Sequence, residues 1–236
     1  MQRDGVAGRL TRNRPYTPDP MAELPIDLEN GLGELLSRSL DVEGKIPRAL
    51  DALGPIAGRD VLLLDVTDGI RARQLRGLGA QVALGGAGSG AGGSVGFGAS
   101  DASADVVVSY WSSFRGAAPG EVAEAQRVLR PGGRLLVVHD YGRDDVSHLR
   151  GELPEYGPWS RRGGPFLGGG FKVRVVHCFW TFESIAQGAE FLAAAFADTG
   201  RELALALKRP RLSYNVAIYH RTFGEATASE SSGIRR

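Results

Sequence analysis

The chain has a single cysteine, Cys178, among its 236 residues, which excludes an internal disulfide and a cysteine-based zinc cluster. It also lacks any apolar run long enough to cross a bilayer. The formal net charge is only +1, without the basic excess typical of nucleic-acid-binding proteins. The arginines near the amino terminus are not followed by the apolar segment of a secretory signal. We therefore expect a soluble, cytoplasmic protein that binds neither membrane nor nucleic acid.

Patterns of several common catalytic classes are missing as well. There is no Ser-His-Asp arrangement, no metal-ligand spacing and no phosphate-binding loop, so we expect no metal. Gly88, Gly90 and Gly93 match the spacing of a dinucleotide fingerprint, but the glycine-rich residues after them cannot open the helix that such a site requires. A dinucleotide-dependent oxidoreductase is therefore a distant alternative.

The chain does contain enough apolar material for one sizeable core. Hydrophobic residues make up 42% of the sequence, and the length suits one α/β domain with additions better than two full domains. Residues 1–25 and 225–236 are polar and show no periodicity. We expect a disordered N-terminal arm over residues 1–25, an α/β domain over 26–224 and a disordered C-terminal tail over 225–236.

Leucines at helical spacing predict a helix over residues 28–40, with Asp27 as its N-cap, and a second helix over about 46–53. A later helical stripe over residues 185–196 is expected to begin after Thr181 and to end at Gly200. Residues 201–208 favour helix by composition. Six strands are expected, near Val61, Gln81, Asp105, Leu135, Lys172 and Ser213.

The segment 121–140 combines a helix, a break and a buried strand. Apolar residues fall on one helical face as far as Leu129, Pro131 cannot continue the helix, and Gly132-Gly133 permit the chain to reverse. Residues 135–138 form an apolar run without alternation, which is typical of a strand covered on both faces. A helix that leads into such a strand is half of a parallel α/β unit, whose ligands bind at the carboxyl ends of the strands.

This segment resembles class I S-adenosylmethionine-dependent methyltransferases, in which a turn like RVLRPGG, here residues 127–133, precedes the fifth strand. Residues 104–111 are similar to the fourth strand of that family, and residues 61–69 to its first strand and cofactor loop. The three segments occur in the family's order, and the resemblance covers roughly residues 46–220. It implies a Rossmann-like three-layer α/β sandwich, with a mostly parallel sheet and an antiparallel C-terminal strand.

The resemblance also implies a cofactor site. Asp65 matches the acidic position of the family's glycine loop and Gly69 its middle glycine, whereas Thr67 and Arg71 replace the outer glycines. The carboxyl end of the fourth strand adjoins this loop. The expected cofactor-binding residues are Asp65, Thr67, Asp68, Gly69, Ser109 and Tyr110.

The acidic residue that holds the ribose in the family has no counterpart here. Gly85 and Gly86 occupy the end of the second strand and offer no side chain, and the next carboxylate is Asp101. Residues 85–98 are too rich in glycine to form a full crossover helix and strand, so we expect an irregular loop. S-adenosylmethionine is therefore the expected cofactor, with its binding weakened or lost.

His139 and Asp140 follow the apolar run at the edge of the sheet where ligands bind. Because histidine exchanges a proton near neutral pH, we expect these two residues as the catalytic candidates, with His139 as the base. The alternative is that His139 fills a polar strand end and Asp140 caps the loop.

Two functions follow from these expectations. The first is a methyltransferase-like protein that acts on a small molecule, chiefly by aligning the acceptor with the methyl group. The second is a catalytically inactive descendant that serves as a binding or regulatory module, because fold does not imply function. The missing ribose carboxylate is the sequence feature that discriminates between these two functions.

Overall fold

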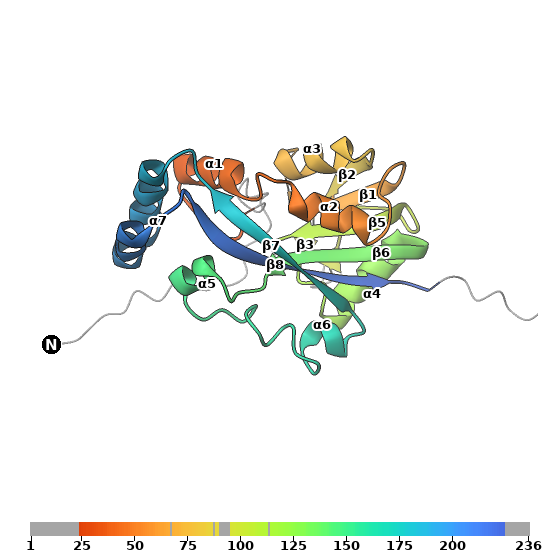
Figure 1. Ribbon diagram of the computed structural model, residues 1–236. Coiled ribbons are helices and arrows are strands. Elements are labelled where there is room, and N and C mark those ends of the chain that lie inside the picture. The colour runs from red at the N-terminus through yellow and green to blue at the C-terminus, as the bar shows by residue number, and fades with distance from the viewer. Residues whose placement is uncertain (1–23, 67, 87, 90–94, 113, 225–236) are drawn as a thin grey trace, which may run out of the picture.

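The computed structural model describes residues 24–66, 68–86, 88–89, 95–112 and 114–224 (Figure 1). The expected tail and residues 1–23 of the expected arm lie outside these ranges. Leu24 and Pro25, the last residues of that arm, pack on the domain: Leu24 is buried, and the Pro25 carbonyl accepts a 2.7 Å hydrogen bond from Arg150. The part of the chain attached to the domain therefore begins before residue 26.

Helices and short strands surround one six-stranded sheet (Figure 1). In chain order the elements are α1 (Asn30–Ser39), α2 (Lys45–Ala52), β1 (Asp60–Leu64), α3 (Ile70–Gly77), β2 (Gln81–Gly85), β3 (Gly88–Ser89), β4 (Val95–Gly96), β5 (Ala104–Tyr110), α4 (Pro119–Val128), β6 (Leu129–Asp140), α5 (Asp145–Arg150), α6 (Pro165–Gly168), β7 (Lys172–Thr181), α7 (Ile185–Ala206) and β8 (Arg211–Thr222).

The strand order is β2-β1-β5-β6-β8-β7. Pairing is parallel from β2 through β6, and β8 runs antiparallel to both of its neighbours, β6 and β7. All six expected strands are present, and the last one is antiparallel as expected. The prediction of a mostly parallel sheet with an antiparallel C-terminal strand is confirmed.

Two apolar cores, one on each face of the sheet, explain why the central strands read as unbroken apolar runs. On what we call the α3 face, Leu63, Val108 and Val138 pack with residues of α1, α2, α3 and α7. On the α4 face, Leu64 and Val137 pack with residues of α4 and α6. Figure 1 shows α2 and α3 on one side of the sheet and α4 and α6 on the other. The structure is therefore the expected three-layer sandwich.

Several element boundaries differ from the expectation. Glu29, not Asp27, precedes α1, and Ser184, not Thr181, caps α7 by accepting a 3.1 Å hydrogen bond from the Gln187 amide. Gly200 does not end α7, because the chain kinks at residues 196–197 and then continues as helix to Ala206. Residues 201–206 are helical, in agreement with their composition.

The prediction that residues 131–133 separate the helix from the strand is wrong. Helix α4 ends at Val128, and the next residue already pairs with Ala104 of β5. The register between β5 and β6 then shifts, so Pro131 to Gly133 form an irregularity inside β6. The glycines are still needed, since Gly132 has φ +78° and a Cβ on Gly133 would lie 2.7 Å from the Arg130 carbonyl oxygen.

The interval 85–98 contains no helix in its described part, as expected. In place of the crossover, β3 and β4, of two residues each, pair as antiparallel strands. Residues 87 and 90–94 lie outside the described ranges. Phe97 then buries its ring edge-to-face against Phe114, with centroids 5.1 Å apart. Beside this short connection lies a hollow of about 490 Å³, lined by Asp60–Leu62, Gln81–Ala83, Ala99, Ser103 and Ala104.

No helix among the described residues is long and apolar enough to span a bilayer.

Candidate functional site

The carboxyl ends of β1 and β5 mark the point where the order of successive strands in the sheet reverses. From β1 the chain passes outward to β2 and then returns to β5 on the other side of β1. Leu64 pairs with Ser109 at this edge, which places Asp65 next to Tyr110. In open α/β sheets the crevice outside such a switch point is the ligand-binding position. Of the expected cofactor residues, Asp65, Ser109 and Tyr110 therefore lie at the edge of the sheet where this fold binds ligands.

Asp65 and Gly69 shape the turn from β1 into α3. Asp65 is buried, has φ +54° and donates its amide to the Gly85 carbonyl at 2.9 Å. Gly69 is the extended N-cap of α3, and Asp68 beside it is exposed and forms an ion pair with Arg76. Thr67 lies outside the described residues. The turn thus leads the chain from the sheet edge directly into the first turn of α3.

Arg71 is a residue that sequence reasoning noted only as a replacement for glycine. Its side chain is fully buried, and its guanidinium carbon lies 5.6 Å from the Tyr110 ring and 5.5 Å from the Trp111 ring. Nη1 donates to Gln74 at 3.0 Å, whereas Nε and Nη2 have no hydrogen-bond acceptor among the residues that the structure describes. The signal in the sequence that could have identified Arg71 as a site residue was an arginine in a loop where the family has glycine.

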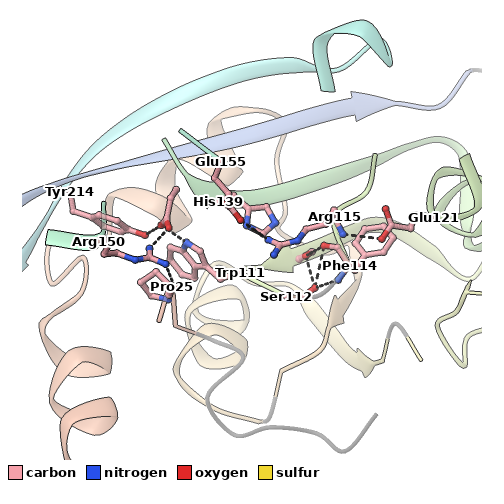
Figure 2. A network of polar contacts seen from close by, with 12 residues as sticks. Pro25, Trp111, Ser112, Phe114, Arg115, Glu121, His139, Arg150, Glu155 and Tyr214 are labelled. Atoms are coloured by element: carbon pink, nitrogen blue, oxygen red, sulfur yellow. Dashed lines mark hydrogen bonds and ion pairs between the residues drawn. The ribbon is translucent and has the colours of Figure 1, made fainter. Parts of the chain in front are cut away.

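Asp140 is enclosed on the α3 face by three donors. Its carboxylate accepts hydrogen bonds from Trp111 Nε1 at 3.1 Å, from the Tyr214 hydroxyl and from the Arg150 guanidinium, with which it forms an ion pair. Burial, followed by the charge of Asp140, raises the pKa of Tyr214 well above its ordinary value, so the phenol remains a donor. Figure 2 shows Trp111, Arg150 and Tyr214 gathered around one point.

His139 lies on the α4 face in a separate group (Figure 2). Its Nδ1 is 3.3 Å from Arg115 Nη1, and Arg115 also forms an ion pair with Glu155 at 3.3 Å. The imidazole packs edge-to-face on Trp159, and its Nε2 has no hydrogen-bond partner within the described ranges. Burial, followed by the charge of Arg115, lowers the pKa of His139 well below its ordinary value of 6.5. The ring is therefore neutral and enclosed.

The structure does not bring His139 and Asp140 together. Strand β6 continues through Asp140, so the two neighbouring side chains project to opposite faces of the sheet. Ser109 likewise faces the α4 side, where its hydroxyl contacts Ser112 Oγ at 3.1 Å and the Phe114 carbonyl at 3.2 Å. The α3 face of this sheet edge therefore keeps Tyr110 and Asp140, with Arg71 and Trp111 added.

The residues present fit one end of S-adenosylmethionine better than the other. On the α3 face, the buried cation of Arg71 and the aromatic rings beside it suit an anionic, partly apolar ligand. At the end of β2, Gly85 leaves no room for a ribose-binding carboxylate: a Cβ there would lie 2.8 Å from the Phe97 carbonyl oxygen and 3.0 Å from Leu62 Cδ1. The amino-acid end of the cofactor therefore fits, and the ribose end lacks its usual anchor.

In the described part of the chain, no group of three or more His, Cys, Asp or Glu side chains is arranged to hold a metal ion. Cys178 is buried in the α3-face core, and burial, together with the charge of Asp41, raises the pKa of its thiol. His177 points to the exposed side of the same strand, where its Nδ1 lies 2.7 Å from Asn215 Oδ1. The two residues therefore form no joint site, as their spacing in the strand indicates.

No protein-family model matches the chain. No curated protein matches it either. Among solved structures, it is similar to an S-adenosylmethionine-dependent methyltransferase from Aquifex aeolicus, with a TM-score of 0.44 and 16% identity over 80% of this chain and 96% of that one. It is also similar to phosphoethanolamine N-methyltransferase 2 from Haemonchus contortus, solved with phosphomonomethylethanolamine and S-adenosylhomocysteine, with a TM-score of 0.40 and 14% identity over 76% of this chain and 52% of that one.

These likenesses are distant, and the strand order itself is the firmer basis for the fold. The sheet has the parallel core and the inserted antiparallel last strand that the resemblance to class I methyltransferases implied. The chain therefore has the class I methyltransferase fold.

Proposed function

We propose that the protein binds S-adenosylmethionine over the carboxyl ends of β1 and β5 and acts as a methyltransferase on a small molecule. The observation that carries the proposal is the meeting of Asp65, Gly69 and Tyr110 at the switch point of the sheet. The cofactor supplies a methyl group on a positively charged sulfur. The chain's own residues bind that cofactor, orient the acceptor and exclude water.

The proposed cofactor contacts differ along this edge. Tyr110 projects to the α3 face, and Asp65 is buried in the turn after β1. Gly69 lets the ligand approach the backbone, and Asp68 remains at the exposed rim. Thr67 completes the loop in sequence. Ser109 would contribute its backbone, because its hydroxyl is hydrogen-bonded on the α4 face.

The catalytic contribution of His139 and Asp140 is proposed to be indirect. Asp140 holds Trp111 through the indole N–H, and Trp111 lies beside Arg71 at the crevice. His139 is enclosed under Trp159, so it would act as a base only after the segment that carries Trp159 moves. We therefore assign catalysis chiefly to alignment of the acceptor with the methyl group.

An inactive binding module is the competing function, and the missing ribose carboxylate at Gly85 is the feature that separates the two. A pair of variants at the two ends of α3 tests whether the crevice binds the cofactor. Gly69→Val should abolish binding of S-adenosylmethionine and S-adenosylhomocysteine in calorimetric titration, because a branched side chain would occupy the cofactor's space. Gly77→Val should bind as the wild type does, since a Cβ on Gly77 meets nothing within 4 Å. Equal binding by both variants would remove the site from this turn.

A further inference from the structure

The guanidinium of Arg71 is buried with unused hydrogen-bond donors in the described part of the chain. The side chain of Arg71 has no exposed surface. Among the described residues, two of its three guanidinium nitrogens have no acceptor, and no carboxylate forms an ion pair with it. A buried charge is costly unless it is paired and hydrogen-bonded. The two aromatic rings beside the guanidinium offset only part of that cost.

The nearby carboxylate of Asp41 does not supply the missing partner. Asp41 accepts hydrogen bonds from the amides of Lys45 at 2.9 Å and Ile46 at 2.7 Å, so it serves as a cap for α2. Burial raises the pKa of Asp41, and these amides and the charge of Arg71 oppose that rise. Arg71 therefore influences Asp41 through space, but no described residue provides an acceptor for its Nε and Nη2.

The position of Arg71 points to a ligand rather than to a structural partner. It is the second residue of α3, whose N-terminal backbone amides add partial positive charge at the same place. It also lies against Tyr110 and Trp111, at the carboxyl end of β5. A carboxylate there would accept from Nε and Nη2 together, in the two-point geometry that arginine prefers.

We propose that Arg71 is an anion-binding residue, which takes the carboxylate of a ligand seated over the ends of β1 and β5. The inference rests on the proposed function for the rest of that ligand. The carboxylate belongs either to the amino-acid end of the cofactor or to the acceptor, and both sources satisfy the same two nitrogens.

Two nucleosides that differ in the carboxylate test the first source. 5′-Methylthioadenosine shares the adenosine and thioether of S-adenosylhomocysteine but lacks its amino-acid end. We expect the wild type to bind S-adenosylhomocysteine roughly 10- to 100-fold more tightly in calorimetric titration, as a charged hydrogen bond provides. Arg71→Met should remove this preference and keep methylthioadenosine binding, whereas Arg73→Met, an exposed position on the same helix, should keep the preference.

Acetate tests the second source. If the wild type shows no preference between the nucleosides, a carboxylate from the acceptor predicts that acetate raises the melting temperature of the methylthioadenosine complex, and that Arg71→Met abolishes this rise. Should Arg71→Met fail to fold, Arg71→Lys replaces it, because lysine keeps the charge and loses the two-point geometry, so it should weaken either effect. The proposal is overturned if the Arg71 variants behave as the wild type does, or if neither carboxylate has an effect.

The same experiment separates this proposal from the proposed function. If neither nucleoside binds at millimolar concentration, the methyltransferase proposal fails, and acetate is then tested on the unliganded protein. A rise in melting temperature that disappears in Arg71→Met would still support an anion site. If methylthioadenosine and S-adenosylhomocysteine bind equally and acetate has no effect, the cofactor site stands and the role of Arg71 is wrong.

Discussion

Asp140 joins segments that lie far apart in the sequence. Its three donors come from the end of β5, from α5 and from β8, and Arg150 in turn holds the Pro25 carbonyl at the start of the domain. A buried carboxylate with this many partners stabilises the fold as long as all of them are present. Asp140 and Arg150 together therefore connect the N-terminal segment to the edge of the sheet (Figure 2).

Asp140→Asn removes the charge that pairs with Arg150 and leaves a buried guanidinium without its counter-ion. The free energy of unfolding in urea should fall by about 3 kcal/mol. Asp198→Asn provides the control, because the Asp198 side chain is 91% exposed and its pair with Arg201 should contribute under about 0.5 kcal/mol. A loss below about 1 kcal/mol for Asp140→Asn would contradict the account.

His139 should make stability depend on pH. Its folded-state pKa lies well below 6.5, so as the pH falls below about 6.5 the unfolded chain takes up a proton that the folded chain does not. Stability should therefore decrease in acid, by up to about 1.4 kcal/mol per pH unit until the folded pKa is reached.

The variant His139→Gln lacks this group, so its unfolding free energy should change less between pH 7 and pH 5 than that of the wild type. Part of the slope should remain, because burial also lowers the pKa of the half-buried His220. The exposed His177, as His177→Gln, serves as the control. Identical pH profiles for wild type and His139→Gln would show that His139 is not enclosed as described.

At the scale of elements, α7 carries an identifiable irregularity. The helix is interrupted at Phe196 and Ala197, and Ala197 has φ +47° and ψ −124°. This region of backbone space is open to glycine and strained for alanine. The kink lets Phe196 stack on Trp180, with ring centroids 6.3 Å apart, so the two halves of α7 can both pack on the core.

Ala197→Gly should relieve this strain and raise the free energy of unfolding by about 1 kcal/mol. Ala194→Gly lies one turn earlier, in the regular part of α7, and should instead lower it by about 1 kcal/mol. Thermal or urea unfolding of the two variants compares them directly. A loss of stability in both would mean that Ala197 is helical in solution.

The elements were predictable wherever an apolar pattern decides them. The runs in β1, β5 and the second half of β6 identified buried parallel strands, and the glycines after β2 predicted the lost crossover. The faces of the sheet to which His139 and Asp140 project were not predicted. They depend on whether β6 continues through Asp140, which is decided by the pairing of Asp140 with Val216 of β8. The cap of α7 was missed for a similar reason, since serine and threonine both serve as N-caps and only the tertiary structure shows that the helix begins after Ser184.

For the whole molecule, the shortened connection between β2 and β5 has two consequences. It leaves β2 as an edge strand, with Leu84 exposed over 43% of its surface, and it leaves the proposed cofactor site without a carboxylate for the ribose. The fold has kept its switch point and Arg71 on one side of the crevice. Cofactor affinity should therefore be weak rather than absent.

Restoring an acidic side chain tests this view of the crevice. Gly86→Asp should strengthen binding of S-adenosylhomocysteine by about 1.5–3 kcal/mol, provided that the loop presents the carboxylate to the ribose. Gly85→Asp should give no gain, because a Cβ at that position collides with the Phe97 carbonyl. The comparison uses calorimetric titration of both variants, and a gain at Gly85 but not at Gly86 would contradict the packing described here.

The central claim is that a methyltransferase-fold sheet with degenerate loops still binds the methyl donor at its switch point. Calorimetric titration of the wild-type protein with S-adenosylmethionine and S-adenosylhomocysteine tests it most directly. We predict saturable binding of both ligands at one site per chain, with weak affinity because the ribose carboxylate is missing. Absence of binding at millimolar ligand, with no binding restored by Gly86→Asp, would contradict the claim and identify the protein as an inactive relative of these enzymes.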